Sequence, residues 1–188
     1  MIVLTDFGDL TVLLPVTAAL LLWLLTSRAW GTAAWWVIAV AICVGITAVL
    51  KIYFTCSPAD ALQSPSGHTS LSTLIYGAIA LIVAHEFDDW RRSVAVVIGI
   101  GLIAGIAVSR IVLGAHSPLE VAFGLAIGLV ALAVFARPYL RRAPPEPSLR
   151  PLWYALLLIA ALHGSQLHAE TMLRALNHYL HIGAVICA

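Results

Sequence analysis

Charged residues are scarce in this chain: only 10% of its 188 residues are Asp, Glu, Lys or Arg. Ordinary soluble domains carry about 25% charged residues. Hydrophobic residues instead make up 62% of the sequence, and the mean hydropathy is +1.00. The shortage of charge excludes a soluble globular protein, and no nucleic-acid partner is expected. The composition predicts an integral membrane protein whose first partner is the lipid bilayer.

The sequence contains six long apolar runs. They lie at roughly residues 10–26, 33–52, 68–85, 93–112, 118–136 and 152–168. Five of the runs are long enough to approach the requirement of about 20 residues for crossing a bilayer, and the sixth is shorter. We therefore predict an all-α, polytopic membrane bundle of about six transmembrane helices, forming a single integral-membrane domain over residues 1–188. A chain of this length leaves no room for a separate soluble domain, so an active site must be built from helix ends and short loops.

Arginines gather in the first, third and fifth connections between these runs. They are Arg28, Arg91, Arg92, Arg137, Arg141, Arg142 and Arg150. The positive-inside rule places those connections in the cytoplasm and the remaining ones outside. Asp6 and Asp9 precede the first run and Arg28 follows it, the reverse of a secretory signal, so we expect a retained span with an outer N-terminus. The expected location is the bacterial inner (plasma) membrane.

Cysteine is also scarce, with three residues in the chain. Cys43 falls within the second apolar run, whereas Cys56 and Cys187 are expected on the outer side. In an oxidising compartment those two thiols can pair if their Cα atoms come within the separation that a disulfide allows. The sequence leaves this pairing open, together with the placement of the C-terminal tail and the oligomeric state.

Histidine is present seven times, and two of the seven stand in informative surroundings. We interpret the others, His85, His163, His168, His178 and His181, as packed or interfacial residues. His68 follows a proline and a glycine and precedes an apolar run, which places Ser66, Gly67 and His68 at a helix N-terminus. Free backbone N–H groups and the helix dipole make such an end an anion site, although an ordinary N-cap explains the same residues.

The second histidine, His116, follows Arg110 at the outer end of the fourth run. Arginine inside a membrane segment is costly, and its planar fork suits phosphate oxygens. Ser117 and Glu120 form a capping-box pattern for the next helix. Glu120 is also four residues after His116, close enough to accept a hydrogen bond from the imidazole and leave the other nitrogen as a nucleophile. The two roles of Glu120 are compatible.

The order of these groups resembles the signature of the type 2 phosphatidic acid phosphatase family, the membrane relatives of vanadium haloperoxidases. The signature region spans residues 51–120: Lys51, then Pro65-Ser66-Gly67-His68, then Ser109-Arg110, His116 and Glu120. The resemblance covers roughly residues 33–136. It implies a lipid-phosphate phosphatase that needs neither metal nor cofactor and works through a phosphohistidine. By this resemblance His116 attacks phosphorus, Glu120 orients it and His68 protonates the leaving oxygen. Lys51, Arg110 and the backbone around Ser66 and Gly67 hold the phosphate.

The chain departs from the family pattern in two places. The arginine expected after Lys51 is missing, with Pro58 one position early, and Glu120 stands where the family has aspartate. The missing arginine keeps open a catalytically weakened protein that binds or transports lipid phosphates. A haloperoxidase, a metalloenzyme that uses His68, His116 and Glu120, and a plain membrane scaffold are further alternatives. The lipid is also open: a polyprenyl phosphate or pyrophosphate, phosphatidylglycerol phosphate, phosphatidate or a lipid A phosphate.

Two glycine pairs predict close helix contacts in the bundle. Gly101 and Gly105 lie in the fourth run, and Gly124 and Gly128 lie in the fifth, each pair at the small-x-x-x-small spacing. Such spacing lets two helix backbones approach each other.

Overall fold

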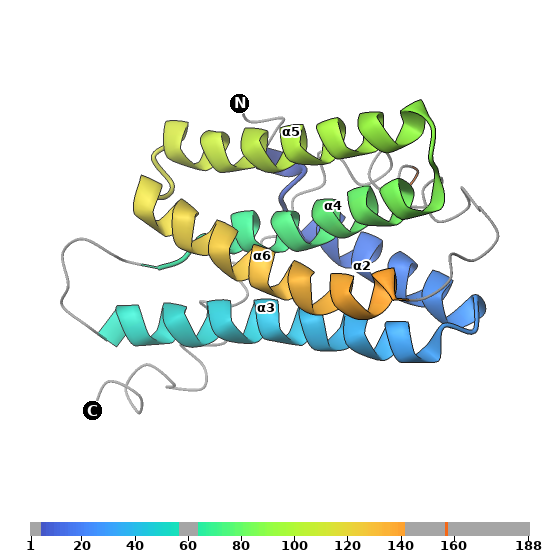
Figure 1. Ribbon diagram of the computed structural model, residues 1–188. Helices are drawn as coiled ribbons and strands as arrows, with labels where there is room; N and C mark the ends of the chain where they lie inside the picture. The colour runs from blue at the N-terminus through green and yellow to red at the C-terminus, as the bar shows by residue number, and fades with distance from the viewer. Residues whose placement is uncertain (1–4, 57–63, 142–156, 158–188) are drawn as a thin grey trace.

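The protein is a bundle of α-helices in a computed structural model that describes residues 5–56, 64–141 and 157 (Figure 1). Its helices are α2 (Leu10–Thr26), α3 (Trp30–Cys56), α4 (Gly67–Glu86), α5 (Trp90–Val112) and α6 (Pro118–Leu140). No strand occurs within those described residues. The predicted all-α fold is therefore confirmed.

Five of the six apolar runs correspond to these helices, and the run at 152–168 lies outside the described residues, as does Cys187. α3, α4, α5 and α6 are each long and apolar enough to cross a membrane. α2 is apolar but shorter, with 17 residues. The chain is thus an integral membrane protein, as its composition predicts.

Polar caps fix where the helices begin. The side chains of Asp9, Ser66, Asp89 and Ser117 each accept a hydrogen bond from a backbone N–H in the first turn of the helix that follows. Such caps satisfy donors that have no partner within the helix. The helices therefore begin next to the polar residues that the sequence places in the connections.

α4 lies at the centre of the bundle and packs against α5, α6 and α3. Glycines on α6 permit its close approach to α4, since a Cβ atom built on Gly124 would lie 2.6 Å from the Ser66 carbonyl oxygen and one on Gly128 would lie 2.5 Å from that of Ser70. The prediction for this pair is confirmed. The prediction of a close helix contact is wrong for Gly101, because a Cβ atom there would meet nothing within 4 Å. α5 instead approaches α4 at Gly99, where a Cβ atom would lie 2.8 Å from Ala80 Cβ.

The outward faces of α3 and α5 are apolar and exposed. Large hydrophobic side chains there include Val37, Val49, Val97 and Ile100. Exposed apolar surface of this extent is unfavourable in water and is normal against lipid acyl chains. The bundle thus has lipid-facing sides, and its polar groups are concentrated at the two ends.

Candidate active site

The histidine motifs meet at one end of the bundle (Figure 1). This end comprises the C-terminal part of α3 with Lys51, the start of α4 with His68, and the turn from α5 to α6 with His116. Arg28, Arg91 and Arg141 lie in or next to the connections at the opposite end. The structure therefore separates the predicted site from the arginine-rich connections by the length of the helices.

His116 is paired with Glu120 across one turn of helix. The imidazole Nδ1 lies 3.1 Å from Glu120 Oε2, and the two side chains are only 11% and 7% exposed. The same carboxylate oxygen accepts the Ser117 N–H at 2.9 Å, while the Ser117 hydroxyl accepts the Glu120 N–H, which completes a capping box. Glu120 is thus both a helix cap and the partner of His116, as the spacing predicts.

Glu120 also joins the start of α6 to the loop before α4. Its Oε1 accepts the Ser64 N–H at 2.9 Å, and its backbone carbonyl accepts the Ser66 N–H at 3.1 Å. The hydrogen bonds join residues that are 54 and 56 positions apart along the chain, and they hold the backbones of the two motifs side by side. A change at Glu120 therefore affects both motifs.

Ser66 is buried, and its polar groups already bind other residues of the protein. Its side chain is fully buried, and its hydroxyl accepts hydrogen bonds from the backbone N–H and the hydroxyl of Thr69. Its own N–H binds the Glu120 carbonyl. Gly67 and His68 follow as the first residues of α4, where backbone N–H groups have no carbonyl within the helix to bind. Gly67 and His68 therefore have backbone N–H groups without a partner inside the helix.

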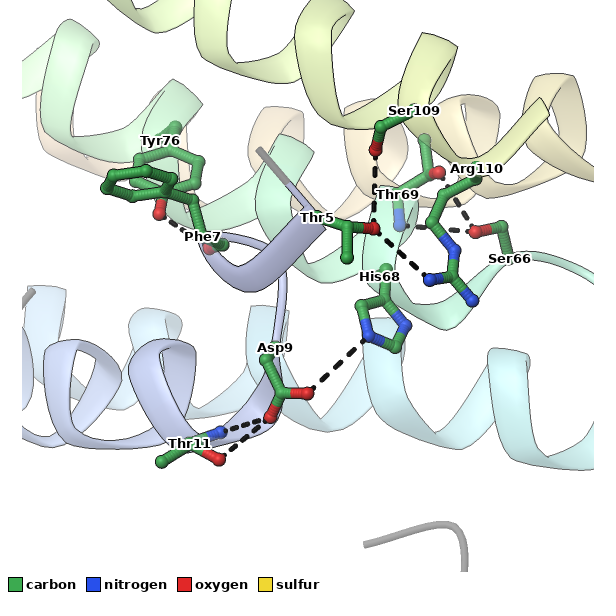
Figure 2. Close-up of polar contacts among 10 residues, drawn as sticks. All are labelled: Thr5, Phe7, Asp9, Thr11, Ser66, His68, Thr69, Tyr76, Ser109 and Arg110. Atoms are coloured by element: carbon green, nitrogen blue, oxygen red, sulfur yellow. Dashed lines mark hydrogen bonds and ion pairs between the residues drawn. The ribbon is translucent and has the colours of Figure 1, made fainter. Parts of the chain in front are cut away.

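Arg110 reaches the same end from α5. The helix finishes two residues later, and Gly114, with φ at +65°, adopts the left-handed conformation that reverses the chain. The Arg110 carbonyl accepts the N–H groups of Ala115 and His116, so the turn places the histidine beside the arginine. Arg110 Nη1 donates to the hydroxyl of Thr5 at 3.2 Å (Figure 2).

The environment of His116 favours the neutral imidazole. Burial is the main cause that lowers its pKa below the usual 6.5, and the positive charges of Arg110 and Lys51 act in the same direction. The hydrogen bond with Glu120 opposes them. A neutral imidazole that donates Nδ1–H to Glu120 keeps a lone pair on Nε2.

Sequence reasoning missed one carboxylate, that of Asp9. Its Oδ2 lies 3.9 Å from His68 Nε2, and the approach is visible in Figure 2. The neighbouring His68 is the largest cause that lowers the pKa of Asp9 to about 2. No local signal connects these residues, because they are 59 positions apart and meet only through packing of the N-terminal segment.

No group of three or more His, Cys, Asp or Glu side chains that could hold a metal ion occurs within residues 5–56, 64–141 and 157. His68, His116 and Glu120 are accompanied by Arg110, whose positive charge disfavours a cation. The arrangement suits an anion.

The fold and this polar end define a membrane protein of phosphatase type. The model of the PAP2 superfamily, whose members are generally phosphatases, matches residues 50–144, a stretch that contains Lys51, His68, Arg110, His116 and Glu120. The chain belongs to this superfamily. It is also 32% identical over 146 residues to a Klebsiella pneumoniae protein named "Uncharacterized 22.5 kDa protein in cps region", covering 75% of this chain and 69% of the relative. No solved structure matches the chain significantly.

Proposed function

We propose that this protein is a lipid-phosphate phosphatase that removes phosphate from a lipid phosphomonoester or pyrophosphate through a phosphohistidine on His116. The observation that carries the proposal is the His116–Glu120 pair at 3.1 Å, buried next to the positive charges of Arg110 and Lys51. A neutral imidazole held by a carboxylate is a nucleophile, and cations beside it attract a phosphate.

In the first half of the proposed reaction, His116 Nε2 attacks phosphorus. A nitrogen–phosphorus bond forms, the bond from phosphorus to the lipid oxygen breaks, and His68 gives its proton to that oxygen. In the second half, neutral His68 takes a proton from water, whose oxygen attacks phosphorus and releases His116. Phosphate leaves, and both histidines return to their starting states. Glu120 compensates the positive charge that develops on His116 in each half.

Phosphate oxygens have several donors at this end of the bundle. We assign them to Arg110, Lys51 and the backbone N–H groups of Gly67 and His68 at the start of α4. The Ser66 N–H is occupied by Glu120, so Ser66 contributes through the shape of the loop. Phosphoryl transfer depends mainly on such fixed donors, because negative charge is spread over the oxygens of the transferred phosphoryl group.

A lipid substrate agrees with the position of the site. The polar groups lie at a helix end, next to apolar faces that contact acyl chains. A lipid can present its phosphate there while its tail stays in the bilayer. Because Arg28, Arg91 and Arg141 lie at the other end, the positive-inside rule favours an active site on the extracytoplasmic face, which is the periplasmic face of a bacterial inner membrane.

The test is phosphate release by the purified full-length protein from polyprenyl phosphate and pyrophosphate, phosphatidylglycerol phosphate, phosphatidate and lipid A phosphate, with EDTA present. We expect release from at least one of them, inhibition by vanadate as a mimic of five-coordinate phosphorus, and loss in His116→Ala. His85→Ala, at the far end of α4, is the matched control. Binding of these lipids without hydrolysis would instead establish the weakened binding or transport protein, and activity that requires a divalent ion would exclude the metal-free mechanism.

A further inference from the structure

A second histidine–carboxylate pair lies at the active-site end, formed by Asp9 and His68. The distance of 3.9 Å from Asp9 Oδ2 to His68 Nε2 corresponds to an ion pair rather than a direct hydrogen bond. Both side chains are partly exposed, at 28% and 25%. Asp9 lies outside the region that matches the PAP2 superfamily, which begins at residue 50.

The segment that carries Asp9 is held against the bundle at three points. The hydroxyl of Tyr76 on α4 donates to the Phe7 carbonyl at 2.7 Å. Thr5 accepts hydrogen bonds from Ser109 and from Arg110 of α5 (Figure 2). Gly8 packs closely as well, since a Cβ there would lie 2.9 Å from Ile106 and 3.5 Å from the Cβ of His68. The approach of Asp9 to His68 is therefore built into the fold.

One role of Asp9 is purely structural, because it caps α2. Its Oδ1 accepts the backbone N–H of Thr11 at 2.9 Å and the Thr11 hydroxyl at 2.8 Å. Serine or asparagine would cap the helix equally well. What aspartate adds is a negative charge on Oδ2, and that oxygen is the one that approaches His68.

We propose that Asp9 is a positioning residue for His68: it faces Nε2, stabilises the protonated ring and leaves Nδ1–H to be delivered to the leaving oxygen. Figure 2 shows the Asp9 carboxylate and the Arg110 guanidinium on opposite sides of the imidazole. The inference rests on the proposed function, in which His68 is the proton donor. When the bond from phosphorus to the lipid oxygen breaks, its electron pair takes the Nδ1 proton, and His68 is left neutral with its remaining proton on Nε2.

Asp9 supplies the negative charge that faces the His68 ring. Arg110 of α5 is a cation on the other side of the ring (Figure 2), and Glu120 is already engaged by His116 and two backbone N–H groups. Asp9, on the N-terminal segment, supplies a negative charge directly against the His68 ring. A protonated His68 in the proposed step would therefore have the Asp9 carboxylate beside it, and Asp9→Asn would remove that charge.

The experiment compares wild type with Asp9→Asn, which keeps the cap and removes the charge; Asp6→Asn is the matched control. Each is assayed on a lipid phosphate, whose alkoxide leaving group needs a proton, and on p-nitrophenyl phosphate, whose phenolate does not. We expect Asp9→Asn to slow release of the leaving group in the first turnover roughly tenfold to a hundredfold on the lipid and by less than about threefold on p-nitrophenyl phosphate. Asp9→Ser, another capping residue, should behave alike if the asparagine variant folds poorly.

Equal losses on both substrates would reduce Asp9 to a structural cap, and unchanged kinetics on both would remove it from the site. Failure of the proposed function looks different. In that case His116→Ala would keep wild-type activity, or His68→Ala would slow release of the leaving group in the first turnover no more on the lipid than on p-nitrophenyl phosphate. Wild-type behaviour of Asp9→Asn alongside inactive His116→Ala would overturn only the inference about Asp9.

Discussion

One end of the bundle contains two histidine–carboxylate pairs, which differ in burial, in distance and in separation along the chain. The His116–Glu120 pair is buried, is joined at 3.1 Å and is made within one helical turn. The His68–Asp9 pair is partly exposed, is separated by 3.9 Å and joins residues 59 positions apart. Burial lowers the pKa of His116, whereas His68 lowers the pKa of Asp9 to about 2, so Asp9 faces His68 as an anion.

The comparison shows how one side chain can serve two roles within the same site. A nucleophile should be neutral, and burial next to cations achieves this for His116. The proposed proton donor, His68, is instead partly exposed and lies beside the Asp9 carboxylate. Two side chains of one type placed in different environments can take different roles in one active site.

The largest expected loss of activity comes from replacing each histidine of the two pairs. His116→Ala should lower kcat at least about a thousandfold on every substrate, because the covalent route is lost. His68→Ala should slow release of the leaving group in the first turnover by a comparable factor on a lipid phosphate and by much less on p-nitrophenyl phosphate. Kinetics on the two substrates measure the difference, with His85→Ala as control. Identical profiles for the two active-site variants would remove the distinction between nucleophile and acid.

A smaller effect is expected when the buried pair keeps its shape and loses its charge. Glu120 accepts hydrogen bonds at both carboxylate oxygens, and glutamine offers only one oxygen, so one contact is lost along with the charge. Glu120→Gln should lower kcat roughly tenfold to a hundredfold, change KM little and reduce the free energy of unfolding by about 1 kcal/mol or more. Reduced thermal stability with wild-type kcat would leave Glu120 as a helix cap only.

The smallest expected effect is a shift in the pH profile of kcat/KM. Because the pKa of His116 is lowered, the acid limb of kcat/KM should lie below pH 6.5, since the nucleophile is lost only when His116 becomes protonated. Lys51 contributes to that lowering, so Lys51→Met should move the limb to higher pH; Glu120 opposes it, so Glu120→Gln should move it to lower pH. Shifts in the same direction for both variants would contradict this assignment of charges.

Local patterns explain why most of this site can be predicted from sequence. Apolar runs mark five described helices to within four residues at each end, and the spacing of Ser117 and Glu120 specifies both the cap and the contact with His116. The burial of Ser66 depends on α6 packing against the preceding loop, which no pattern within the loop encodes. Asp9 was missed for the same reason: its local sequence indicates only an N-cap, and its approach to His68 requires the packed N-terminal segment.

The most direct test of the account is to trap the phosphorylated enzyme. Wild-type protein, mixed with a phosphate substrate and quenched in base within one turnover, should carry one phosphoryl group on His116, stable to base and labile to acid, and His116→Ala should carry none. In Asp9→Asn the same adduct should form from p-nitrophenyl phosphate and form slowly from the lipid. Phosphate found on His68, or hydrolysis with no phosphohistidine at any stage, would contradict the assignment of His116 as the nucleophile.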